Sequence, residues 1–398
     1  MSKKVKENSS LKYWVWLSSL SGVSTFVAGE YLKHFKTPEN VFLASDNELR
    51  NIAGFDSRGN VIPIRQNIHD AEKVIETCAL KNYQIITLDD KNYPDRLKNI
   101  YDPPIAFYVN GKLPDIDNEP IVAIIGTRQC TPYGYKAAEK IACGLSEKGI
   151  TVITGLALGI DTAASLGALK GGTHSLGVIG SGLDVIYPSE NKKLFDDLSH
   201  RGAIISEYAP GFQPRAWSFP ARNRIVSGLS LGVLIIEAPK KSGALITAER
   251  AVEQGRDVFV LPGNIDMKTC EGSNLLLRDG AIPVLSAEDI INEYKELFSD
   301  KIHTKVKTRT TPRNNVKTID NTPYMQYIDL NVLLGTLYGD EKLVANTIGN
   351  DIVHVDDIIK KSKLSTHQVL TALTMLEVNG YAVSDGSKFF RLQQTQAQ

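Results

Sequence analysis

A buried strand followed by a glycine turn and a helix is the segment that most restricts how this chain can fold. Residues 121–125 read Ile-Val-Ala-Ile-Ile, an apolar run typical of a parallel strand that is covered on both faces. Gly126 allows a tight turn, Arg128 adds a positive charge, and a helical pattern covers about residues 135–148. Backbone N–H groups and the positive end of the helix dipole would face this turn. We therefore expect a phosphate site at Gly126, Thr127 and Arg128.

Apolar strands and helical patterns alternate through the middle of the chain. The expected strands cover residues 121–125, 151–154, 175–179, 203–206, 233–237, 257–261 and 282–285. This alternation predicts an α/β fold with a Rossmann-like, doubly wound and mostly parallel sheet. Ligands of such sheets bind beyond the carboxyl ends of the strands, so the residues that follow each strand are the candidates for a site.

The composition excludes several classes of protein. A chain of 398 residues is long enough for about two to three domains. Lysine plus arginine and aspartate plus glutamate each total 45, which argues against a generally basic protein but allows a local basic site. The four cysteines form no CxxC pair, so we expect no metal cluster and no disulfide framework. No apolar run reaches the roughly 20 residues of a membrane span, and we expect a cytoplasmic protein.

Four regions are expected along the chain. They are a helical N-terminal domain that is SAM/helix-hairpin-helix-like (1–80), the Rossmann-like DNA-binding core (81–298), a basic linker (299–322) and a winged-helix domain (323–398). In the first region, residues 20–24 resemble a helix-hairpin-helix turn, and residues 49–55 are a weaker second copy. A helical packing domain without DNA contact explains this region equally well.

The last region shows two helical patterns, 355–361 and 365–378, and then a possible hairpin over 381–392 that turns at Asp385-Gly386. Helix, turn, helix and hairpin indicate a winged helix. The second helix has no lysine or arginine, although cations are the usual readers of the major groove. We therefore favour a protein-contact or regulatory role for this domain over sequence-specific DNA binding.

Cations and aromatic side chains collect in the loops after the expected strands. The cations are Arg128, Lys192, Lys193, Arg215, Arg222, Arg224, Lys240 and Lys241. The loop after residues 203–206 adds aromatic residues, of which Trp217 or Phe219 is a candidate for base stacking. Glycine-containing turns at Gly155 and at Gly180-Ser181-Gly182 allow close approach of a ligand. The pattern favours single-stranded DNA as the ligand. The alternative is that Phe219 packs under the sheet and the lysines are merely solvated.

Three enzyme classes can be compared with these loops. A nicotinamide dehydrogenase needs GxGxxG after the first strand, and a phosphate-loop ATPase needs GxxxxGK[ST]; both motifs are absent. A nucleoside-monophosphate phosphoribohydrolase related to lysine-decarboxylase-like proteins stays open. Asp184, Glu207, Glu237 or Glu249 could supply its carboxylate, although the double-glycine PGG loop of those proteins is missing.

Several ordered motifs together closely resemble the DNA-processing protein A (DprA/Smf) family of bacteria. They are Gly126-Thr127-Arg128, residues 154–161, Gly180 to Asp184 with Tyr187-Pro188, residues 206–208, residues 219–224 and residues 242–247. The strong part of the match covers roughly residues 94–284, and the flanks fit the family layout. The resemblance implies a protein that is not an enzyme and needs no cofactor. It would bind single-stranded DNA, dimerise, protect DNA in natural transformation and load the RecA recombinase.

The resemblance also implies roles for individual residues. Arg128 and the backbone of Gly126 and Thr127 would hold a phosphate, and Lys192 and Lys193 would line the same groove. The groove would be completed by Arg222, Asn223, Ser242 and Gly243.

Overall fold

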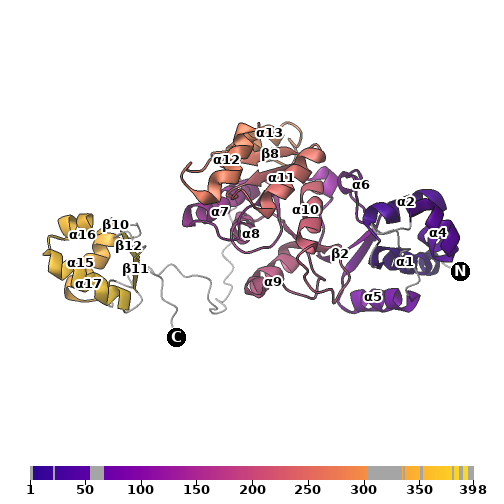
Figure 1. Ribbon diagram of the computed structural model, residues 1–398, viewed down its shortest axis with the longest axis horizontal. Helices are drawn as coiled ribbons and strands as arrows, with labels where there is room; N and C mark the ends of the chain where they lie inside the picture. Colours follow the sequence, from indigo (N-terminus) through magenta and orange to yellow (C-terminus); the bar gives the residue numbers. More distant parts are fainter. Residues whose placement is uncertain are drawn as a thin grey trace. The chain divides into compact units, whose positions relative to one another are not determined.

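The computed structural model describes two compact units, Met1–Arg309 and Thr310–Gln398 (Figure 1). The described residues are 3–20, 23–53, 67–302, 334, 337–349, 353–378, 381–384 and 389–392. Within these ranges no helix is both long enough and apolar enough to cross a bilayer.

Five helices open the first unit. They are α1 (Lys3–Ser19), α2 (Thr25–Phe35), α3 (Pro38–Leu43), α4 (Asp46–Ala53) and α5 (Ile68–Leu80). Ser24 and Thr37 start α2 and α3, because their side chains accept hydrogen bonds from the first turn of each helix. Trp16, Tyr31 and Val41 are buried together between the helices. The expected helical N-terminal region is confirmed, whereas Ser21, Gly22, Gly54 and Phe55 of the two expected turns lie outside the described residues.

A nine-stranded sheet forms the centre of the first unit. Its strands are β1 (Gln84–Thr87), β2 (Ala106–Gly111), β3 (Ile121–Ile125), β4 (Thr151–Thr154), β5 (Ser175–Ile179), β6 (Gly202–Ser206), β7 (Gly232–Ile235), β8 (Asp257–Val260) and β9 (Ile282–Pro283). They lie in the order β1-β2-β6-β5-β4-β3-β7-β8-β9. The pairings of β1 with β2 and of β2 with β6 are antiparallel, and all other pairings are parallel. The chain builds one half from β3 to β6 and then crosses to β7, which confirms the doubly wound Rossmann-like fold.

Helices cover both faces of this sheet. They are α6 (Asp95–Lys98), α7 (Pro132–Glu147), α8 (Ile160–Gly171), α9 (Lys192–Arg201), α10 (Ser218–Gly228), α11 (Gly243–Glu253), α12 (Glu271–Arg278) and α13 (Ala287–Tyr294), with short 3-10 turns at Ile116–Asn118, Ser189–Asn191 and Lys268–Cys270. Side chains of β3 alternate between the faces. Ile121, Ala123 and Ile125 pack with α10 and α11, while Val122 and Ile124 pack with α7, α8 and α13. This double coverage explains why the strand is a continuous apolar run.

The second unit has the order of a winged helix. Its elements are α15 (Gly339–Ile348), β10 (Val353–His354), α16 (Val355–Ser362), α17 (Thr366–Val378), β11 (Ala382–Ser384) and β12 (Phe389–Leu392). The three strands pair in the order β10-β12-β11. The expected winged helix is therefore confirmed, although its hairpin turn at Asp385-Gly386 and most of the expected basic linker lie outside the described residues. Lys301, at the start of that expected linker, pairs with Glu119 at 2.9 Å.

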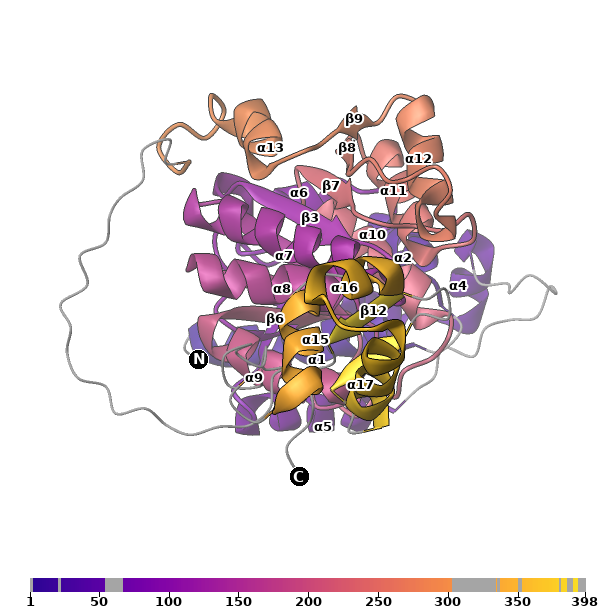
Figure 2. The same ribbon diagram turned by 90° about the vertical axis from the view of Figure 1, so that its left-hand side faces the viewer.

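The helices α7 and α8 lie side by side at very short range (Figure 2). Gly167 of α8 permits this approach, since a Cβ atom there would meet the backbone oxygen of Glu139 in α7 at 2.2 Å. Because the obstacle is backbone, it cannot move as a side chain would. The loop after β3 leads into α7, and the loop after β4 leads into α8. The contact between the two helices therefore also fixes the distance between these two loops.

Replacing Gly167 with alanine should therefore force α7 and α8 apart and lower the free energy of unfolding by about 1–3 kcal/mol. Gly29→Ala in α2 is the matched control, because a Cβ atom there meets nothing within 4 Å. That control should be neutral or stabilising by up to about 1 kcal/mol. Urea unfolding of both variants measures the difference, and equal midpoints would contradict a close α7–α8 contact.

Candidate nucleic-acid interface

A pocket lies beyond the carboxyl ends of β3, β4 and β5. Its walls come from the β4–α8 and β5–α9 loops and from the start of α10, with Leu156, Ile179, Tyr187 and Phe219 among the lining side chains. Two arginines, Arg128 and Arg222, line the same pocket, as do the expected site residues Gly155 and Gly180. The pocket therefore combines apolar side chains with the positive charges of Arg128 and Arg222. Such a lining suits a ligand in which a flat, apolar ring is attached to a negatively charged group.

Arg128 is exposed at this pocket. Its guanidinium carbon lies 5.3 Å from the centroid of the Phe219 ring, within the range of a cation–π contact. Phe219 in turn contacts Tyr187, with 5.5 Å between ring centroids. No ion pair of Arg128 occurs among the described residues. The charge is thus held by an aromatic face and can meet an external anion.

Arg222 is only 5% exposed and forms the inner part of the pocket. Its guanidinium lies against the backbone of Gly155, where a Cβ atom would collide with it. One terminal nitrogen donates to the Val178 carbonyl, while Nε is buried without a hydrogen-bond partner. Burial lowers the pKa of Arg222 to about 10, and the nearby Asp161 opposes this shift. A buried arginine donor without a partner among the described residues is unusual; Arg256 Nε, outside the pocket lining, shows the same feature.

Asp161 is a buried carboxylate in the first turn of α8. It accepts hydrogen bonds from the N–H groups of Gly155 at 2.9 Å and Ala157 at 3.4 Å, and from the Gly126 backbone. Burial raises its pKa to about 6, whereas Arg222 and the three backbone donors act in the opposite direction. The carboxylate therefore occupies the place that an external anion would take at the start of this helix.

Glu237 plays the same part at the start of α7. Its carboxylate accepts from the backbone N–H of Thr131 at 3.0 Å and from the Thr131 hydroxyl, and its carbonyl accepts from the N–H of Thr127 at 2.8 Å. These internal hydrogen bonds differ from the expectation that the backbone N–H groups of Gly126 and Thr127 hold a phosphate. Both N–H groups already have internal acceptors, so at this turn the exposed Arg128 side chain is the stronger candidate for an external phosphate.

Lys192 and Lys193 begin α9 and are exposed. The preceding Asn191 fixes their position, because its side-chain amide donates to the carbonyl of Leu156 at 3.0 Å. Leu156 lines the pocket. The start of α9 is therefore tied to the pocket wall, while the two lysines themselves do not line the pocket, and their contact with a ligand stays a prediction.

Other expected site residues lie outside the pocket lining. Ser181 and Gly182 are buried, where the Ser181 hydroxyl donates to Val185 and the Gly182 N–H donates to Phe212. Asn223 donates its side-chain amide to the Gly243 carbonyl, and Ser242 caps α11. Asn223 and Gly243 thus join α10 to α11, and a role of these residues in binding stays a prediction.

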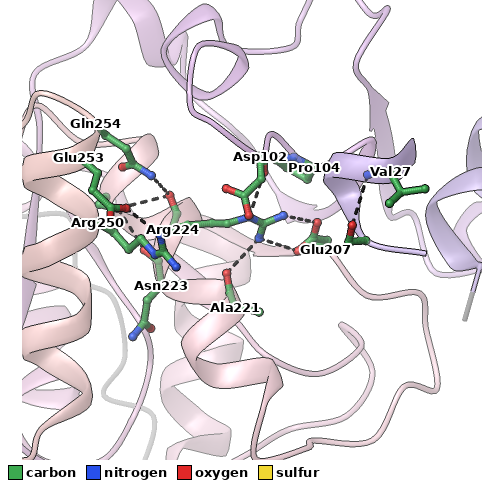
Figure 3. Close-up of polar contacts among 12 residues, drawn as sticks. Val27, Asp102, Pro104, Glu207, Ala221, Asn223, Arg224, Arg250, Glu253 and Gln254 are labelled. Atoms are coloured by element: carbon green, nitrogen blue, oxygen red, sulfur yellow. Dashed lines mark hydrogen bonds and ion pairs between the residues drawn. The ribbon is translucent and has the colours of Figure 1, made fainter. Parts of the chain in front are cut away.

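The carboxylates of the hydrolase alternative are mostly occupied by structural partners. Glu207 pairs with Arg224 at 2.6 Å, and Asp102 pairs with the same arginine at 3.0 Å (Figure 3). Asp184 pairs with Lys81 and accepts from the Gly211 N–H. With Glu237 capping α7, only Glu249 is exposed. None of these carboxylates lines the pocket.

Two residues make contacts at the pocket that the sequence does not predict. Tyr187 supports Phe219, and Asp161 faces Arg222. An acidic residue in the first turn of a helix is common, so its position in the sequence alone does not separate a helix cap from a partner of a distant arginine.

Comparisons with known proteins agree with this arrangement. The family model described as DNA recombination-mediator protein A matches residues 84–295, and a model of the DprA winged helix domain matches residues 335–386. Protein Smf from Synechocystis is 34% identical over 395 residues, which cover 94% of this chain and 96% of that protein. The DNA processing protein DprA from Streptococcus pneumoniae is 46% identical over 228 residues, which cover 57% of this chain and 79% of that protein.

The X-ray structure of DprA from Streptococcus pneumoniae has a TM-score of 0.59 at 36% identity, covering 71% of this chain and 97% of that chain. The resemblance that the ordered motifs indicate is therefore confirmed across the core and the winged helix: this chain belongs to the DNA recombination-mediator protein A family, whose members are named DprA and Smf.

Proposed function

We propose that this protein binds single-stranded DNA without sequence preference. In this proposal Arg128, Lys192 and Lys193 contact the phosphates, and one base stacks on Phe219 inside the pocket. The observation that carries the proposal is the Arg128 guanidinium over the Phe219 ring, which places a cation and an aromatic wall at one pocket. A base in a duplex is paired and stacked, so only an unpaired strand can offer both groups at once.

The energetics favour a linear polyanion over a small nucleotide. Arg128 lines the pocket, and the lysines begin α9 directly after Asn191, which contacts the pocket residue Leu156. We propose that neighbouring phosphates of one strand reach both groups of cations. A stacked base adds about 1–3 kcal/mol, and each phosphate contact releases counterions. The internal carboxylates Asp161 and Glu237 already occupy the two helix starts that a dinucleotide cofactor would use. We therefore propose a binding protein and not an enzyme.

We further propose that the protein acts in the cytoplasm, protects incoming DNA and loads a RecA-type recombinase onto it. Membership in a recombination-mediator family supports this role.

We also propose a homodimer that forms through the Rossmann-like region. Two exposed apolar side chains support it: Ile265, which follows β8, is 85% exposed, and Leu285, which follows β9, is 78% exposed. For the winged helix we retain a protein-contact role, because α17 has no lysine or arginine.

Arg128→Ala should weaken binding to every single-stranded sequence alike. Loss of one phosphate contact should reduce the slope of log K against log salt by about 0.7. The matched control is Arg278→Ala, because Arg278 is 73% exposed, pairs with Asp279 and does not line the pocket. Fluorescence anisotropy of a labelled oligonucleotide at several salt concentrations measures both quantities. Unchanged affinity and slope would remove Arg128 from the interface.

Deleting residues 323–398 should leave most of the affinity for single strands intact, because the proposed contacts all lie in the first unit. Gel-shift titration of the full and shortened chains is a direct comparison, with circular dichroism to show that the shortened chain stays folded. A large loss of affinity in a folded protein would make the winged helix a DNA-binding element.

The hydrolase alternative predicts that free base is released from nucleoside monophosphates, and that Glu207→Gln or Glu237→Gln abolishes the release. We expect no release by the wild-type protein. We expect Glu207→Gln to lower the free energy of unfolding by about 1–3 kcal/mol instead, because the buried Arg224 then keeps only one of its two charged partners, Asp102. Chromatography of the reaction mixture and urea unfolding separate the two outcomes, and base release by the wild type would refute a purely binding role.

A further inference from the structure

Trp217 is an exposed aromatic residue next to the pocket. Its side chain is 60% exposed, in contrast to Trp16, which is 2% exposed. The Trp217 ring makes edge-to-face contacts with Tyr208 and Phe212, at centroid distances of 5.8 and 5.9 Å. Tyr208 and Phe212 themselves stack at 4.3 Å. The indole is therefore supported by two rings while much of its surface remains open to solvent.

The loop that presents Trp217 is fixed at several points. The Gly211 N–H donates to the Asp184 carboxylate at 2.6 Å, and the Phe212 carbonyl accepts from the Gly182 N–H at 2.9 Å. Next to the indole, the Ser218 hydroxyl donates to the Gly180 carbonyl at 2.6 Å. A ring held in this way loses little conformational entropy when a ligand stacks on it, which makes it a suitable platform.

Trp217 is close to Phe219 along the chain. Trp217 immediately precedes α10, and Phe219, two residues later, forms the pocket wall. The first turn of α10 has no acidic residue, but its Ser218 N–H already donates to the Arg215 carbonyl and Pro220 has no N–H, so an anion would be attracted there by the helix dipole and by nearby cations and not by free backbone donors. Arg215 is exposed in the same loop. Two aromatic rings thus flank a helix start that favours negative charge.

We propose that Trp217 is a second base-stacking platform, which receives the nucleotide adjacent to the one at Phe219. This inference rests on the proposed single-strand binding. The phosphate between the two bases would lie at the start of α10, and the strand would continue toward Arg215. Since every base has an aromatic face, the second platform increases affinity and the length of strand bound without adding sequence preference.

The experiment compares Trp217→Ala and Trp217→Phe with the wild type in the full-length protein, using labelled oligo(dT) and anisotropy. Trp217→Ala should weaken binding about tenfold, the middle of the range for one stacked base. Trp217→Phe should retain most of the affinity, because it keeps a flat ring. The salt slope should stay unchanged in both variants, since neither loses a phosphate contact.

Intrinsic fluorescence supplies a second measurement. Oligo(dT) should quench a component of the wild-type emission, and this component should be missing from Trp217→Phe. Tyr101→Ala is the control, because Tyr101 is 81% exposed and stacks on Phe26 of α2 away from the pocket lining. This control should bind oligo(dT) as the wild type does.

Each contrary result has a clear meaning. Wild-type affinity of Trp217→Ala together with no quenching would overturn the second platform, and binding through Arg128 would still stand. A fall of the salt slope by about 0.7 in Trp217→Ala would also overturn it, because the residue would then organise a phosphate contact. If the wild type itself fails to bind oligo(dT), the proposed function fails first.

Discussion

The buried carboxylate of Asp161 holds together the loops on which the pocket depends. It accepts hydrogen bonds from the loops after β3 and β4 and faces Arg222, which comes from α10 on the other side of the site. Segments far apart in the sequence therefore share one internal anion. Without it, the arginine would keep an uncompensated charge in the interior, and several backbone donors would lose their acceptor. Phe219 belongs to the same helix, α10, as Arg222, so the interaction of Arg222 with Asp161 also helps to position the Phe219 ring.

The same interaction shows why a Rossmann-like fold does not determine the ligand. In such folds the helix starts near the middle of the sheet commonly bind phosphates. Here the protein fills those positions with its own carboxylates, Asp161 and Glu237, and keeps Arg128 at the surface. In the proposed interface the anion would therefore meet the side chains around the turn and not the backbone of the turn. An exposed cationic surface suits a long strand better than an enclosed cofactor.

Much of the fold follows from local patterns in the sequence. The apolar runs at 121–125, 151–154 and 175–179 are strands with those limits, and the winged helix follows from its helix spacing. The exposed position of Arg128 at the pocket follows from the rule that sites lie beyond strand ends. The same rule does not predict that the carboxylates of Asp161 and Glu237 accept the hydrogen bonds of the backbone turns. Thr131 and Glu237 are 106 residues apart, and their contact depends on β7 lying next to β3, which a single sequence does not reveal.

Helix α10 has one more consequence for the molecule. Arg222, at the floor of the pocket, and Arg224, which is clamped between Glu207 and Asp102, belong to a single turn of this helix. Asp102 directly follows Tyr101, whose ring rests on Phe26 of the N-terminal helices. The pocket and the seam with those helices are thus mechanically linked through one stiff segment. We therefore expect a displacement of the N-terminal helices to reach the pocket through residues 101–102 and Arg224.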